Sequence, residues 1–186
     1  NLKDDKSSEI ITSEQLHKIT GEQVQYVLVS KWKDENSFYV ELGNKVFLIN
    51  TLKQTGKLVA EMPNAIENKD INVLTGNVAY TVDNDLYISG NNAPVEKTSE
   101  TVVSGQAIAR SEFGITNGTF WSNNGEYLAY YQKDEKAVAN YPLVNIHAPT
   151  GLLEAIRYPM AGQASETAFV CVYNLKSGEI VKIKTK

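Results

Sequence analysis

Residues 106–132 read QAIARSEFGITNGTFWSNNGEYLAYYQ, and this stretch decides the fold. The segment Phe120-Trp121-Ser122 is followed by Asn123-Asn124-Gly125, and then by Tyr127-Leu128-Ala129-Tyr130. Aromatic and aliphatic runs on both sides of an Asn-Gly turn are typical of an antiparallel hairpin. The stretch therefore predicts two paired strands, entered from a segment with an isolated carboxylate, Glu112.

The hairpin pattern occurs in three consecutive units, and the spacing of the units indicates the architecture. The second strand of each unit begins near residues 38, 78 and 127, and the third begins near residues 46, 86 and 170. A unit of about 40 residues with four short strands is the repeat of a β-propeller blade. The larger third step predicts an insertion between the second and third strands of the last unit.

These intervals predict an all-β chain, a partial β-propeller of about three four-stranded antiparallel blades with an insertion in the third. Residues 1–23 form a lead-in with a short helix at Ser13–Lys18, capped by Thr12 or Ser13. The propeller fragment is 24–186, with units at about 24–60, 70–98 and 118–184 and a proline-containing, loop-rich insertion at about 133–167. Because a ring needs at least about four blades, we expect this chain to be the start of a longer ring.

Composition excludes several classes of protein. The 186 residues are 42% hydrophobic and 22% charged, which is typical of a globular protein. The net charge is −4 and the sequence has no basic stripe with interleaved aromatics, so nucleic acid is not expected as a partner. The one cysteine, Cys171, excludes an internal disulfide and reads as a small buried side chain. No apolar run is long enough to span a membrane. The chain begins with Asn1 rather than Met, so we expect that a signal peptide or another segment was removed.

The sequence lacks the motifs of the common catalytic sites. It has no Gly-x-Ser-x-Gly elbow, no nucleotide-binding glycine loop and no metal-ligand cluster, and His17 and His147 have no Ser or Asp partners at a recognisable spacing. We therefore predict no catalytic residue, no cofactor and no metal in this chain. Trp32 and Trp121 are expected to pack between blades, with a stacking platform for a sugar or peptide as the alternative.

Two stretches together carry a resemblance to a known family. RSEFGI at 110–115, followed by FWSxxGxxLAYY, resembles the N-terminal propeller of the dipeptidyl peptidase IV family, bacterial type, serine exopeptidases of the prolyl oligopeptidase clan. Tyr158-Pro159-Met160-Ala161-Gly162 resembles a Tyr-Pro-x-Ala-Gly segment that follows in that family. The resemblance implies that the Ser, Asp and His of the parent enzyme lie in a C-terminal α/β-hydrolase domain that this chain lacks. The chain alone is then not expected to hydrolyse peptides.

The resemblance also implies a role for Glu112. In the family, a pair of Glu residues before the Trp-Ser hairpin holds the free amino terminus of the substrate, because a buried ammonium needs carboxylate acceptors. Glu112 matches the second Glu, while Ser111 stands in the place of the first, and Arg110 is a candidate to support it. This role requires 107–115 to be an excursion rather than a strand. The alternative is that Glu112 is a solvated loop carboxylate.

The implied function is a non-catalytic segment that gates access and binds the substrate, in a parent that cleaves X-Pro or X-Ala dipeptides from peptide amino termini. Its implied partners are a peptide with a free amino terminus, the remaining propeller, the hydrolase domain and a second copy of the parent. Export to the bacterial periplasm or cell envelope is expected as well. The alternative is a propeller that binds proteins or glycans without catalysis.

Overall fold

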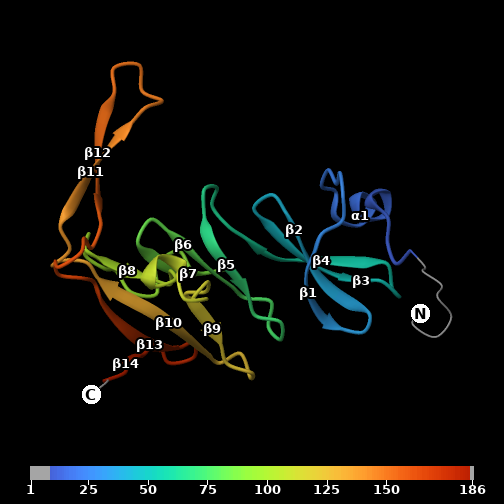
Figure 1. The fold of residues 1–186 in the computed structure, drawn as a ribbon. Helices are drawn as coiled ribbons and strands as arrows, with labels where there is room; N and C mark the ends of the chain where they lie inside the picture. The colour runs from blue at the N-terminus through green and yellow to red at the C-terminus, as the bar shows by residue number, and fades with distance from the viewer. Residues whose placement is uncertain (1–8, 185–186) are drawn as a thin grey trace.

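Three antiparallel sheets follow one another along the chain and lie side by side (Figure 1). The computed structural model describes residues 9–184, apart from the side chain of Arg110. The first sheet contains β1 (Val29–Asp34), β2 (Ser37–Leu42), β3 (Lys45–Asn50) and β4 (Thr55–Glu61) in sequential order. The second contains β5 (Glu67–Ile71), β6 (Val78–Val82) and β7 (Asp85–Ile88). The prediction of three consecutive antiparallel sheets is therefore confirmed.

The third sheet is built around the long strand β10. Its strands are β8 (Val102–Ser104), β9 (Thr119–Trp121), β10 (Tyr127–Asp134), β13 (Thr167–Asn174) and β14 (Ile180–Lys182). β13 pairs with β10 along its whole length, and β8 and β9 each pair with part of it. The sheets thus have four, three and five strands. The expected fourth strand of the second sheet is missing among residues 9–184, because β8 pairs with β10 instead.

The insertion in the third unit is more regular than expected. Between β10 and β13, β11 (Asn140–Asn145) and β12 (Leu152–Arg157) pair with each other in a two-stranded sheet. This hairpin projects away from the three sheets (Figure 1). The insertion thus contains a paired hairpin that the sequence did not predict, with irregular segments before and after it.

The short helix near the amino terminus is α1 (Ser13–Thr20). Thr12 is its N-cap: the backbone N–H of Gln15 donates to Thr12 Oγ1 at 3.0 Å, and the N–H of Thr12 donates to Gln15 Oε1 at 2.8 Å. This reciprocal pair is a capping box, which satisfies two backbone donors of the first turn. The helix buries Leu16 against the first sheet, so the lead-in is tied to the propeller fragment.

The core alternates along the central strands, as the twofold period of a β-strand requires. In β2, Phe38 and Val40 join the cluster under α1, while Tyr39 joins the cluster between the first and second sheets. In β6, Val78 and Tyr80 face the first sheet, whereas Ala79 joins the cluster shared with the third sheet. Each of these strands is thus buried on both faces, which locks neighbouring sheets together.

Cys171 belongs to the cluster between the second and third sheets and is 1% exposed. Burial raises the pKa of its thiol, so the neutral form predominates at neutral pH. The expectation of a small buried side chain is confirmed.

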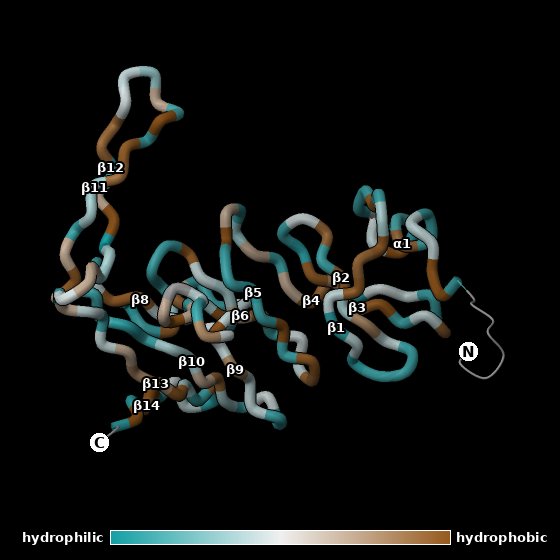
Figure 2. The backbone as a smooth tube through the Cα atoms, in the orientation of Figure 1, coloured by the Kyte–Doolittle hydropathy of each residue, from teal (hydrophilic) through white to brown (hydrophobic). Residues whose placement is uncertain are grey.

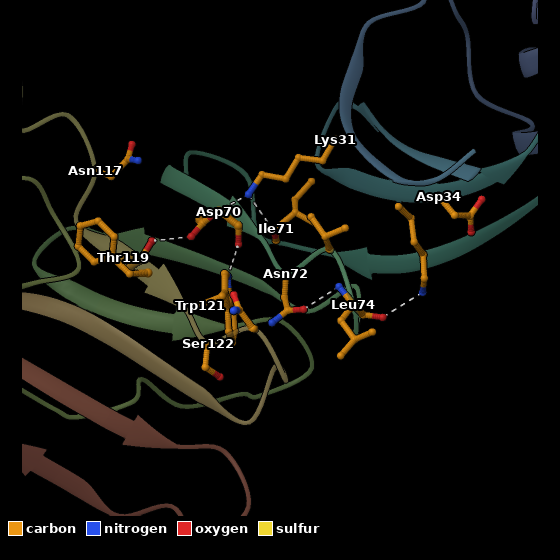
Figure 3. Close-up of a pocket in the computed structure, with 14 residues that line it drawn as sticks. Lys31, Asp34, Asp70, Ile71, Asn72, Leu74, Asn117, Thr119, Trp121 and Ser122 are labelled. Carbon is orange, nitrogen blue, oxygen red and sulfur yellow. Dashed lines mark hydrogen bonds and ion pairs between the residues drawn. The ribbon is translucent and has the colours of Figure 1, made fainter. Parts of the chain in front are cut away.

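Strands β1, β5 and β9, one from each sheet, meet at Asp70 (Figure 3). Lys31 Nζ of β1 lies 2.6 Å from Asp70 Oδ1, and Thr119 Oγ1 of β9 donates to Asp70 Oδ2 at 3.2 Å. Trp121 Nε1 donates to the backbone carbonyl of Asp70 at 3.1 Å. One residue of β5 therefore ties β1 to β9, and Trp121 packs between sheets as predicted. Trp32 does not pack between sheets, so that prediction was wrong: its side chain is 47% exposed and contacts Phe38 edge to face.

Replacing Asp70 by Asn tests this tie. We expect Asp70→Asn to lower the free energy of unfolding by about 1–2 kcal/mol, because the change removes a charge-assisted hydrogen bond that is only partly screened by solvent. Glu35→Gln, at an exposed turn, is the matched control and should change stability by less than ~0.5 kcal/mol. Urea unfolding measures both, and equal midpoints for the two variants would contradict the assignment.

Candidate functional site

Glu112 lies on a loop that the third sheet forces outward. Ser104 at the end of β8 pairs with Gln132, and Thr119 at the start of β9 pairs with Tyr130, on the same edge of β10. Tyr131, between these two positions, closes the base: its carbonyl accepts from Gly105 N at 2.8 Å, and its N–H donates to the Gly118 carbonyl at 2.9 Å. Residues 105–118 therefore leave and re-enter the sheet at neighbouring points.

Gly118 makes this closure sterically feasible. A Cβ atom at this position would lie 2.3 Å from the carbonyl oxygen of Gly105 and 2.3 Å from the carbonyl carbon of Gln106. These are backbone atoms, which cannot move aside as the end of a side chain can. The close approach of the two ends of the loop thus requires glycine at 118.

The loop carries a short turn rather than a strand. A 3-10 helix, η1 (Ala109–Ser111), ends at Glu112, whose backbone N–H donates to the Ala109 carbonyl at 2.9 Å. Glu112 is exposed, and the neighbouring Phe113 is 88% exposed. The segment 107–115 is thus an excursion, as the hypothesis for Glu112 requires. The side chain of Arg110, predicted as support, lies outside the described part of the structure.

The excursion meets the insertion at a pocket of about 370 Å³. The pocket is lined by residues of both segments: Ala109, Glu112, Phe113, Tyr158, Pro159, Met160, Ala161, Gln163, Ser165 and Glu166. The two stretches that the sequence marks, RSEFGI and YPMAG, therefore come together in space. Ser111, the neighbour of Glu112, is exposed but does not line this pocket.

A second carboxylate, Glu166, lines the same pocket and was not predicted. Its Oε1 accepts a hydrogen bond from Ala109 N at 3.3 Å, and its Oε2 lies 3.8 Å from Lys133 Nζ. Lys133 Nζ is also 2.7 Å from Glu135 Oε1. Lys133 thus joins Glu135 and Glu166 in an ion-pair cluster beside this pocket.

A larger pocket, of about 590 Å³, lies where β1, β5 and β9 meet (Figure 3). Its polar groups largely satisfy one another: Lys31 Nζ donates to the Ile71 carbonyl at 2.9 Å, and Lys33 Nζ donates to the Leu74 carbonyl at 2.9 Å. These contacts join the sheets, so we assign this pocket to the fold rather than to ligand binding.

Among residues 9–184, no three His, Cys, Asp or Glu side chains are grouped so that they could hold a metal ion. Within the same range, no helix is both long enough and apolar enough to cross a membrane.

Consecutive antiparallel sheets that pack against one another are the blades of a β-propeller, and this chain forms part of one. The chain belongs to the family described as the dipeptidyl peptidase IV (DPP IV) N-terminal region, whose model matches residues 21–186.

Solved structures and curated proteins agree with this assignment. The chain is similar to a Bacteroides ovatus protein designated a dipeptidyl aminopeptidase IV, with 34% identity and a TM-score of 0.85 over 97% of this chain and 26% of that one. It shares the fold of Porphyromonas gingivalis dipeptidyl peptidase 4, at 20% identity and a TM-score of 0.63 over 86% of this chain and 24% of that one. A dipeptidyl-aminopeptidase B of Talaromyces marneffei is 23% identical over 128 residues, 57% of this chain and 14% of the relative. The chain thus spans about a quarter or less of these relatives' lengths.

Gly118→Ala tests the closure of the loop. We expect it to lower the free energy of unfolding by about 1–3 kcal/mol, because the added methyl meets the backbone of Gly105 and Gln106 at the other end of the loop. Hydrogen exchange at the amides of Gly105 and Tyr131 should become faster at the same time. Thr116→Ala, on the exposed part of the loop, is the control. Unchanged exchange in Gly118→Ala would show that the base is not held as described.

Proposed function

We propose that this chain is the non-catalytic propeller segment of a serine dipeptidyl peptidase and that Glu112 binds the free amino terminus of the peptide substrate. The parent enzyme would remove X-Pro or X-Ala dipeptides, with its Ser, Asp and His in a C-terminal hydrolase domain. The propeller would gate access to that domain, and the parent would be exported to the periplasm or cell envelope.

The observation that carries the proposal is the pocket shared by Glu112 and 158–166. Family membership supplies the class of enzyme, and the pocket supplies a reason to assign this particular carboxylate. Glu112 is held away from the sheet by a closed loop, and it lines a concave surface together with a second carboxylate, Glu166. An ammonium group placed there would gain short charge-assisted hydrogen bonds.

Glu112→Gln in the full-length parent tests this role, because it removes the charge and keeps the shape. A charge-assisted hydrogen bond contributes about 1.5–3 kcal/mol, so kcat/KM for a Gly-Pro chromogenic substrate should fall roughly 10- to 150-fold. The fold should be unaffected, since exposed substitutions usually change stability by less than ~0.5 kcal/mol.

The control is Glu100→Gln, an exposed carboxylate outside the pocket. Equal kinetics for wild type and Glu112→Gln would remove Glu112 from the site and leave it as a solvated loop carboxylate. Turnover by the 186-residue chain itself would refute the non-catalytic assignment.

We also propose that the parent associates as a homodimer through the β11–β12 hairpin. The hairpin stands clear of the sheets and carries hydrophobic residues along both strands (Figure 2). Val144, Ile146 and Leu153 are 61%, 82% and 75% exposed. A two-stranded hairpin is only marginally stable by itself, so a second copy would both cover these side chains and support the hairpin.

Leu153→Glu in the parent should shift the species seen by sedimentation velocity from dimer to monomer. Burying an unpaired carboxylate in an apolar interface is unfavourable, which is the physical reason for the shift. Leu52→Glu is the matched control, because Leu52 is 76% exposed in a turn of the first sheet, away from the hairpin. A parent that is monomeric before any substitution, or a dimer unaffected by Leu153→Glu, would exclude this interface.

A further inference from the structure

The turn that carries Glu112 has a strained backbone. Ala109, Ser111 and Phe113 have φ angles of 51°, 62° and 56°, which lie in the left-handed region. Residues with a Cβ atom adopt this region at a cost, and here three alternate residues do so within five positions. Strained conformations of this kind persist only where surrounding contacts hold them, so the turn needs an anchor outside itself.

Glu166 provides such an anchor. Its side chain is 12% exposed, and Oε1 accepts the hydrogen bond from Ala109 N, the first residue of η1. Glu166 is itself fixed from two sides. The next residue, Thr167, pairs with Asp134 at the end of β10, and Lys133 Nζ of β10 lies 3.8 Å from Glu166 Oε2. The carboxylate therefore connects the rigid β10–β13 ladder to the strained turn.

We propose that Glu166 is a positioning residue: it holds the turn at Ala109 so that the Glu112 carboxylate stays directed at the pocket. This inference rests on the proposed function of Glu112. Glu166 acts through Glu112 and need not touch the substrate. Ser111 cannot anchor the turn in this way, because it is itself part of η1 and has no carboxylate.

Two substitutions separate the hydrogen bond from the charge. Glu166→Gln keeps an acceptor oxygen for Ala109 N–H, while Glu166→Ala removes it. In the full-length parent we expect Glu166→Ala to raise KM for a Gly-Pro chromogenic substrate by about three- to tenfold with little change in kcat, the effect of losing one hydrogen bond. Glu166→Gln should restore most of the loss.

A double-mutant cycle with Glu112→Gln tests whether Glu166 acts through Glu112. If it does, Glu166→Ala should cause no further loss of kcat/KM in the Glu112→Gln background, because the positioned charge is already absent. An equal loss in both backgrounds, or wild-type kinetics for Glu166→Ala while Glu112→Gln is impaired, would overturn the proposal and leave the function of Glu112 intact.

Hydrogen exchange of the parent provides a readout that does not depend on substrate. Peptides covering 105–118 should exchange faster in Glu166→Ala than in wild type, and Glu166→Gln should resemble wild type. Unchanged exchange in Glu166→Ala would show that the carboxylate does not hold the turn. If Glu112→Gln has wild-type kinetics, the proposed function of Glu112 fails. Faster exchange in Glu166→Ala would then identify Glu166 as a structural anchor only, and the positioning role would be overturned as well.

Discussion

The edge of β10 is the constraint on which the candidate site depends. β8 and β9 both pair with this edge, and the backbone groups of Tyr131 between them bind the two ends of the intervening segment. Since the strand offers no further room, residues 105–118 must leave the sheet, and their ends must come so close that only glycine fits at 118. The position of Glu112 is therefore a consequence of strand pairing rather than of the loop sequence alone.

The opposite edge of β10 supplies the other wall of the pocket. β13 pairs with β10 along its whole length, so residues 158–166 enter the sheet beside Asp134. The excursion leaves the other edge at Tyr131, and the two segments meet at the pocket. Lys133 of β10 lies between Glu135 and Glu166 and fixes that end electrostatically. One long strand thus brings together two loops that are about fifty residues apart in the sequence, while Asp70 of β5 ties β1 to β9.

Much of this fold could be predicted from apolar runs and turn residues, because β2, β6 and β10 are rich in apolar residues, and Gly43-Asn44 and Asp83-Asn84 follow β2 and β6. The pairing of β8 could not, since three residues carry too weak a pattern to show which strand they join. The cap of α1 was predicted at Thr12 or Ser13, and the structure has Thr12, which forms a capping box with Gln15. Glu112 stood out by its motif, but Glu166 did not: its role arises from a contact with Ala109, 57 positions away, which no local pattern encodes.

The central claim is that the pocket between the Glu112 turn and 158–166 receives an ammonium group. A crystal structure of the full-length parent with a bound dipeptide that has a free amino terminus tests it most directly. The account predicts the peptide nitrogen within about 2.7–2.9 Å of a Glu112 carboxylate oxygen, with the Ala109–Glu166 hydrogen bond intact. A peptide whose amino group is held elsewhere, with Glu112 directed into solvent, would contradict it.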